Sequence, residues 1–219
     1  MKTFLSIGSG PGIGYETAAR FAKEGYRVVL SARNLDKLNT LAESLRALGA
    51  VVEVRPVDAA QPTVVAALVN EVAQRFGAID VLHYNAAHLQ QATIASQALE
   101  TFNSDLAVNI GGALAAIQAV QPGMAKQGHG TILLTGGGFS MYPSPDYLSL
   151  SIGKAGIRAL THGLFEAGKA LNVHVATVTV CAFVSPETAQ TAEIAEQFWA
   201  LHSQPKEAWT AEVMYPAAG

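Results

Sequence analysis

The stretch YLSLSIGKAG, residues 147–156, places one lysine in an otherwise apolar run, with a tyrosine seven positions before it. A phenol beside a lysine ammonium is suited to acid–base catalysis. In a helix Tyr147 and Lys154 would share a face, but their Cα atoms would be roughly 10 Å apart along the axis. The tyrosine therefore reaches the lysine only if the chain before residue 148 is not yet helical. The position one turn before the lysine is Leu150.

A second candidate for chemistry is the glycine-rich segment GSGPGIG, which separates an apolar run from an amphipathic pattern. Glycines let the backbone turn tightly and approach a pyrophosphate, whose charge is then stabilised by the N-terminus of the next helix. An ordinary strand-to-helix turn is the alternative. The spacing G-x-x-x-G-x-G at the start of a βαβ unit favours a dinucleotide-binding loop, whose cofactor-binding residues are Gly8, Gly10, Gly12, Ile13 and Gly14.

The second apolar run ends in LSARN, where a domain that prefers NAD usually has an acidic residue for the ribose hydroxyls. Ser31 and Arg33 stand there instead, and this pair favours the 2′-phosphate of NADP(H) over NAD. A solvated arginine at a helix start is the alternative for Arg33. Asp58 follows the third run and is placed to accept a hydrogen bond from the adenine amino group, or to be a plain loop residue.

The elements that must position these residues alternate along the chain. Asn34 and Gly49 bracket a helix with leucines at 35, 38, 41, 45 and 48, and a second helix runs from Pro62 to Gly77. The strict alternation of apolar strands with amphipathic helices predicts one doubly wound, Rossmann-type α/β domain over residues 1–219, with a parallel sheet. In such a sheet, ligands bind at the carboxyl ends of the strands. Seven apolar runs are the predicted strands: 4–8, 27–32, 51–57, 79–85, 131–136, 174–183 and 211–215.

The amino-acid composition limits the classes of partner that we expect. Half of the residues are hydrophobic and 14% are charged, and the net charge of −3 comes with no basic cluster. Nucleic acid and membranes are therefore disfavoured as partners, and a small-molecule substrate is favoured. Residues 106–125 carry no charge but include Asn109 and Pro122, which indicates a buried or subunit-interface helix. The single cysteine, Cys181, fits a buried strand in a reducing cytoplasm, and the isolated His83 and His88 suggest no metal site.

These motifs resemble the short-chain dehydrogenase/reductase family over nearly the whole chain. The matching segments are GSGPGIG, YNAA at residues 84–87, Asn109 in LAVNIGG, and Lys154 in GKAG. The resemblance implies that Asn85 and Ala86 border the cofactor, that Lys154 contacts the nicotinamide ribose, and that Asn109 holds a water in a proton relay. It also implies a homodimer or homotetramer built partly on the helices that contain Asn109 and Lys154.

The sequence departs from that family at the residues that do the chemistry. Leu150 stands in place of the catalytic tyrosine, Gly137 in place of the catalytic serine, and Cys181-Ala182 in place of a Pro-Gly turn. Tyr147 is the first candidate for the missing proton donor. Further candidates for substrate contacts are Ser151, Ser140, Tyr142 and the backbone of the three glycines at 136–138.

Two functions follow. The first is an NADP(H)-dependent oxidoreductase that exchanges hydride between nicotinamide and a small carbonyl or alcohol, with Lys154, Asn109 and Tyr147 as catalytic residues. The second is an NADP(H)-binding protein without turnover, acting as a sensor or as an oligomer partner. The retained cofactor motifs favour the first, and the loss of tyrosine and serine favours the second.

Overall fold

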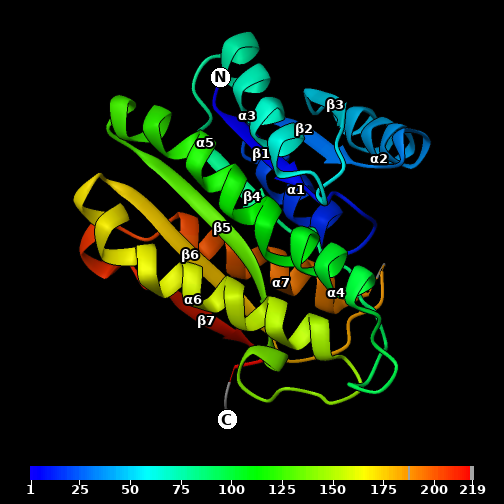
Figure 1. The fold of residues 1–219 in the computed structure, drawn as a ribbon. Coiled ribbons are helices and arrows are strands. Elements are labelled where there is room, and N and C mark those ends of the chain that lie inside the picture. Colours follow the sequence, from blue (N-terminus) through cyan, green and yellow to red (C-terminus); the bar gives the residue numbers. More distant parts are fainter. Residues whose placement is uncertain (187, 218–219) are drawn as a thin grey trace.

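The computed structural model describes residues 1–186 and 188–217 and is built on one seven-stranded sheet (Figure 1). All neighbouring strands run parallel, in the order β3-β2-β1-β4-β5-β6-β7, which confirms the predicted doubly wound fold. The strands are β1 Thr3–Ile7, β2 Arg27–Ala32, β3 Val52–Pro56, β4 Val81–Tyr84, β5 Gly130–Gly137, β6 Val173–Val180 and β7 Glu212–Tyr215.

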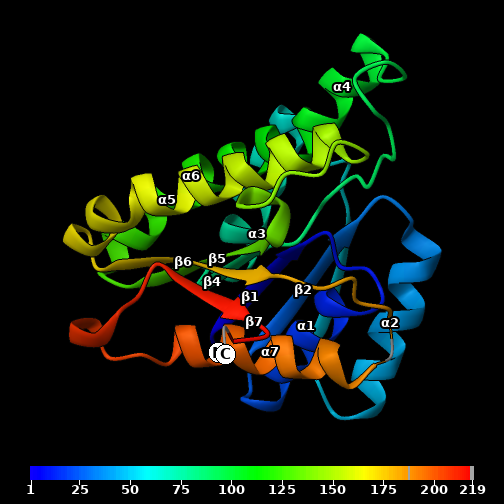
Figure 2. The same cartoon turned by 90° about the horizontal axis from the view of Figure 1, so that it is seen from below.

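Helices cover both faces of the sheet (Figure 2). One face carries α1 Ile13–Lys23, α2 Leu35–Ala47 and α7 Ala189–His202. The other carries α3 Pro62–Phe76, α4 Leu99–Leu106, α5 Gly112–Gln127 and α6 Leu148–Ala170. Each face has its own apolar core, because the strands alternate between the two faces and are buried on both. Phe4 and Phe21 stack in the first core, and Tyr84 lies in the second.

The predicted helix boundaries are largely confirmed. Asn34 caps α2, its side-chain oxygen accepting from the Lys37 N–H at 2.9 Å, and Gly77 ends α3 in a left-handed conformation (φ 84°). The expected five-leucine face of α2 is too wide. Leu35 and Leu48 are 45% and 79% exposed, because they lie at the two ends of the helix, beyond the edge of the sheet core.

The uncharged segment at 106–125 belongs to one long helical rod, in which α4 continues into a π-helical turn, Ala107–Gly111, and then into α5. A π turn carries an extra residue, and such turns are frequent at functional sites. No helix in the described residues combines the length and apolar character that crossing a bilayer requires.

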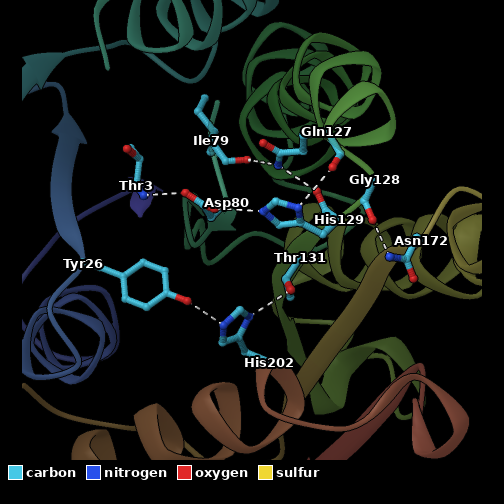
Figure 3. Close-up of polar contacts among 10 residues, drawn as sticks. All are labelled: Thr3, Tyr26, Ile79, Asp80, Gln127, Gly128, His129, Thr131, Asn172 and His202. Carbon is cyan, nitrogen blue, oxygen red and sulfur yellow. Dashed lines mark hydrogen bonds and ion pairs between the residues drawn. The ribbon is translucent and has the colours of Figure 1, made fainter. Parts of the chain in front are cut away.

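The amino end of the sheet is closed by polar side chains (Figure 3). His202 contacts the Tyr26 hydroxyl at 2.8 Å and the Thr131 hydroxyl at 2.9 Å, which ties α7 to β2 and β5. Asp80 accepts from the Thr3 N–H at 2.7 Å and contacts His129. Burial lowers the pKa of His202 to about 4, with smaller contributions from Lys2 and His174, so its ring is neutral at physiological pH. This end therefore stabilises the fold, and the opposite, carboxyl end is left for ligands.

Candidate functional site

The glycine-rich loop is closed on β4 by close backbone contacts. Gly8 has a left-handed conformation (φ 89°), and a Cβ built on it would lie 2.3 Å from the Ala86 backbone nitrogen. A Cβ on Gly14 would lie 2.9 Å from the Gly8 carbonyl oxygen. The Gly8 and Ser9 N–H groups both donate to the Ser31 carbonyl, at 2.8 and 3.0 Å. Only glycine fits at these two positions, because a side chain would collide with the neighbouring backbone.

Helix α1 begins at this loop with Gly12 (φ 94°) as its N-cap and no side-chain cap. Within the described part of the chain, the N–H groups of Ile13 and Gly14 have no backbone acceptor outside the helix. A Cβ on Gly10 would meet open space. The free donors, the helix N-terminus and the open loop surface fit a pyrophosphate.

Asn85, expected to border the cofactor, is fixed by a chain of hydrogen bonds that begins in the core. Its amide nitrogen donates to the Gly8 carbonyl at 2.9 Å, and its oxygen accepts from the Thr135 hydroxyl at 2.8 Å. That hydroxyl lies 3.2 Å from Nε2 of His83, whose Nδ1 faces Ser6. Since Thr135 donates to Asn85, it must accept from His83, which assigns the Nε2–H tautomer. Burial lowers the pKa of His83 to about 3, so the ring is neutral.

The three residues proposed for the adenosine end lie in different environments. Ser31 is fully buried, and its hydroxyl donates to the Arg55 carbonyl at 2.7 Å, so its side chain holds β2 to β3. Arg33 is exposed at the end of β2. Asp58 accepts from Gln61 and from the Ala60 N–H, and these bonds, with the nearby Arg33 charge, lower its pKa. Of the two residues expected to hold a 2′-phosphate, Arg33 has its charged group available.

Asn109 lies in the π turn and is 2% exposed. Its side chain holds the loop after β4, accepting from the His88 N–H at 2.7 Å and donating to the His88 carbonyl at 3.4 Å. The buried Tyr84 hydroxyl donates to the Val108 carbonyl at 2.5 Å, which satisfies a group in the turn. A Cβ on Gly153 would lie 2.5 Å from the Asn109 Cβ, so glycine lets α6 approach the turn closely.

Lys154 extends from α6 over the end of β5. Its Nζ donates to the Thr135 carbonyl at 2.7 Å, and its methylenes lie 3.2 Å from the position of a Cβ on Gly137. Burial lowers the pKa of Lys154 to about 8. The fold thus brings Lys154 to the same strand end as Asn85, since Thr135 contacts both.

A cavity of about 660 Å³ opens at this edge of the sheet. Its wall runs from Ile13 and Asn85 of the cofactor loops, past Lys154 and Leu150, to Phe139 and Phe183. Apart from Lys154, the side chains on the α6 and β6 side are mostly apolar, as in typical small-molecule pockets. One continuous site therefore contains the end of the glycine-rich loop, Lys154 and the apolar wall.

Comparisons with known proteins agree with this geometry. The family model for short chain dehydrogenases matches residues 2–197. An uncharacterized oxidoreductase of Staphylococcus saprophyticus is 34% identical over 74% of this chain and 65% of its own length, so the match leaves a third of that relative uncovered. A glucose 1-dehydrogenase of Gluconobacter oxydans is 30% identical over 92% of this chain and 77% of its own. The structure of an actinorhodin polyketide ketoreductase variant with NADPH superposes with a TM-score of 0.88 at 25% identity, covering 99% of this chain and 95% of that one.

The chain belongs to the short-chain dehydrogenase/reductase family. Leu150, at the position where the sequence resemblance predicts the family's tyrosine, is 5% exposed and lines the cavity. Tyr147, the sequence-predicted donor, is the N-cap of α6 and stacks on Phe139 with a centroid distance of 5.7 Å. Its ring also lies 6.2 Å from Phe183, so it packs in an aromatic cluster beside the cavity. A catalytic role for Tyr147 stays a prediction.

The other residues that the sequence analysis considered in this region lie in different environments. Ser151 bonds back to the Tyr147 carbonyl at 2.8 Å and accepts from the Ser144 N–H, so it holds the start of α6. Tyr142 is 75% exposed and lies at the cavity rim. The expectation that Cys181 is a buried strand residue is wrong, because β6 ends at Val180 and the cysteine is exposed on the cavity wall.

Sequence reasoning also missed a polar cluster beneath the site. The fully buried Asp105 on α4 accepts from the Ser149 hydroxyl at 2.5 Å and contacts Nδ1 of His88. It joins α4, the start of α6 and the loop after β4. Ser149 and His88 are far apart in sequence and neither matches a motif, so only the fold reveals the cluster.

Proposed function

We propose that this protein is an NADP(H)-dependent oxidoreductase that reduces a small carbonyl compound to an alcohol, or runs the reverse reaction. The observation that carries the proposal is the continuous cavity between the cofactor loops and Lys154. When bound, the nicotinamide supplies or accepts the hydride. Family membership and the oxidoreductase relatives support this class of reaction.

The cofactor would be held mainly by backbone. The N–H groups of Ile13 and Gly14 would face the pyrophosphate, the open surface at Gly10 would give it room, and Gly8 and Gly12 would shape the loop around it. Arg33 is proposed for the 2′-phosphate and Asp58 for the adenine, which makes NADP the preferred cofactor over NAD. The neighbour solved with NADPH supports this preference by similarity.

The residues of the chain nearest the reacting groups have distinct tasks. Asn85 and Ala86 would border the nicotinamide, and Lys154 would contact its ribose and supply positive charge beside the substrate oxygen. Asn109 orders the loop that follows β4 through its contacts with the His88 backbone. The apolar wall from Leu150 to Phe183 excludes water from the substrate side.

A binding protein without turnover is the second candidate function. The observation that favours it is Leu150, which places an apolar, 5% exposed side chain where the family has its proton donor. Under either function we expect the protein to act in the cytoplasm and to form a homodimer or homotetramer through α5 and α6. Only 14% of the residues are charged, against about 25% in a typical soluble domain, and this low charge content supports burial of surface between subunits.

Two measurements separate these functions. Fluorescence titration should give tighter binding of NADPH than of NADH. NADPH consumption should then be followed with a panel of aliphatic and aromatic aldehydes, ketones and diketones, with product detection by mass spectrometry. Turnover with at least one carbonyl class supports the reductase. Tight NADPH binding without turnover across the panel would leave the binding protein, and the absence of NADPH binding would contradict both.

A further inference from the structure

The cavity wall offers few groups able to give a proton to a substrate oxygen. Among the described residues that line it, three are titratable, namely Lys154, Tyr142 and Cys181. Tyr142 is 75% exposed on the loop at the rim, and burial, with a smaller contribution from Glu212, raises the pKa of the Cys181 thiol. Lys154 alone comes from the helix that carries the family's acid–base residues.

The lysine lies where the missing side chains would have been. Its methylenes pass over Gly137, 3.2 Å from the position that the Cβ of a serine would occupy. In the described structure its ammonium donates to one acceptor, the Thr135 carbonyl. An ammonium has three N–H donors, so two remain for a ligand in the cavity.

The alternative donors are held elsewhere. Leu150 has no proton to give, and it lines the cavity beside the lysine. Tyr147 stacks on Phe139 and contacts Phe183, and its ring does not belong to the cavity wall. Ser151 is occupied by the Tyr147 carbonyl and the Ser144 N–H.

We infer that Lys154 donates the proton directly to the substrate oxygen, in place of a tyrosine at position 150. The inference rests on the proposed reductase function. With a reduced nicotinamide bound, its hydride would go to the carbonyl carbon, the C–O π bond would break, and its electron pair would take a proton from Nζ. The N–H bond breaks and leaves a neutral amine, which solvent reprotonates because the lysine is partly exposed.

The electrostatic surroundings suit this role. Burial lowers the pKa of Lys154 to about 8, and a general acid works best with a pKa near the operating pH. The titratable groups around it are Cys181 at the end of β6, Tyr142 on the rim loop and, beyond Asn109, the paired Asp105 and His88. The carboxyl group of Asp105 already accepts from the Ser149 hydroxyl and contacts Nδ1 of His88. Carbonyl reduction should therefore proceed below about pH 8 and slow as the ammonium loses its proton above it.

The first test compares Lys154→Met, Lys154→Arg, Tyr147→Phe and Tyr142→Phe, each after NADPH affinity has been measured by fluorescence. We expect kcat for carbonyl reduction to fall about 10²- to 10⁴-fold in Lys154→Met, and to fall less in Tyr147→Phe and Tyr142→Phe than in Lys154→Met. In the wild type kcat should fall tenfold per pH unit above about pH 8. Lys154→Arg should lose kcat as Lys154→Met does at every pH, because a guanidinium does not give up its proton in this range.

The second test measures the protonation of Lys154 in the absence of catalysis. Protein labelled with ¹³C at the lysine Cε is titrated by NMR, with the Lys154 resonance assigned by its loss in Lys154→Arg. A midpoint near 8 that coincides with the kinetic break supports the inference. A midpoint above 10, or loss of activity in Tyr147→Phe or Tyr142→Phe with Lys154→Met still active, would overturn it while leaving the reductase function intact. A wild type that binds NADPH but reduces no carbonyl would overturn both.

Discussion

The two halves of the carboxyl edge of the sheet differ in how they are built. The half after β1, β2 and β4 is polar and fixed by backbone contacts, from the Gly8 N–H on Ser31 to the Asn85 amide on Gly8. The half after β5 and β6, with the start of α6, presents Leu150, Phe139 and Phe183 around a single lysine. Under the proposed function, the first half would bind the cofactor, and the second half would carry proton transfer, with Lys154 as the proposed donor.

We call the half of the edge after β1, β2 and β4 the cofactor half, and the half after β5 and β6 the substrate half. The largest expected effect comes from Gly8→Ala in the cofactor half. It adds left-handed strain of about 1–2 kcal/mol and a clash with the Ala86 backbone of about 1–3 kcal/mol, so the free energy of unfolding should fall by roughly 2–5 kcal/mol. Gly25→Ala is the matched control, because Gly25 has the same sign of φ (80°) and open space around it. It should lose only the strain, about 1–2 kcal/mol. Equal losses in denaturant unfolding would contradict the closed loop, as would unchanged NADPH binding in Gly8→Ala.

In the substrate half, Leu150→Tyr should raise kcat by roughly 10- to 100-fold, because a phenol one helical turn before Lys154 adds a second acid. Leu150→Phe is the control, since it has the same ring without the hydroxyl and should not raise kcat. NADPH affinity should change in neither variant. Steady-state kinetics and fluorescence titration check both halves, and a gain that Leu150→Phe shares would mean that pocket shape, not acidity, limits the reaction.

A smaller effect is expected at the outer edge of the cofactor half. Arg33→Ala should raise the Kd for NADPH about tenfold, or about 1.4 kcal/mol, and leave the Kd for NADH unchanged, because only NADPH carries the 2′-phosphate. Lys37→Ala, a neighbouring exposed cation on α2, is the control for general charge. Parallel loss of NADPH and NADH binding in Arg33→Ala would rule out a specific phosphate contact.

The smallest effect at neutral pH is expected for His83→Leu, about 1 kcal/mol of stability with a few-fold weaker NADPH binding, because Thr135 loses the donor that orients its hydroxyl toward Asn85. At acid pH, the wild type should become the less stable of the two proteins. The folded pKa of His83 is about 3, below the unfolded value of 6.5, so the unfolded state binds the proton first. Wild-type stability should therefore fall by about 1.4 kcal/mol per pH unit from this group below pH 6.5, and the variant should lose less.

His202→Leu serves as the comparison for this pH effect. Its folded pKa is also depressed, to about 4, but it lies at the amino end of the sheet. It should flatten the acid profile in the same way without changing NADPH binding. Equal changes in NADPH affinity in both histidine variants would show that the chain from His83 to Asn85 does not control the cofactor half.

Much of the fold could be predicted because its signals are local. The seven strands, the Asn34 cap and the glycine loop are each encoded in a few adjacent residues. The predicted positions of Asn109 and Lys154 likewise followed from motifs, and the structure places Lys154 on the cavity wall and Asn109 behind it, against the loop after β4.

The site chemistry was harder to predict because its partners meet only in three dimensions. The contacts of His83 with Thr135 and of Tyr147 with Phe183 join elements distant in sequence. The exposure of Cys181 depends on where β6 ends, and the β-branched run before it gave no stop signal. The buried hydroxyl of Ser31 followed from the register of β2 against β3, which no single run contains.

The most direct test of the account is isotope transfer. The wild type should be incubated with NADPH carrying deuterium at C4 of the nicotinamide and with the carbonyl panel, and the products analysed by mass spectrometry. The account predicts an alcohol with deuterium on the former carbonyl carbon, formed by the wild type and strongly reduced in Lys154→Met. An intact protein that binds NADPH but yields no deuterated alcohol with any carbonyl class would contradict it.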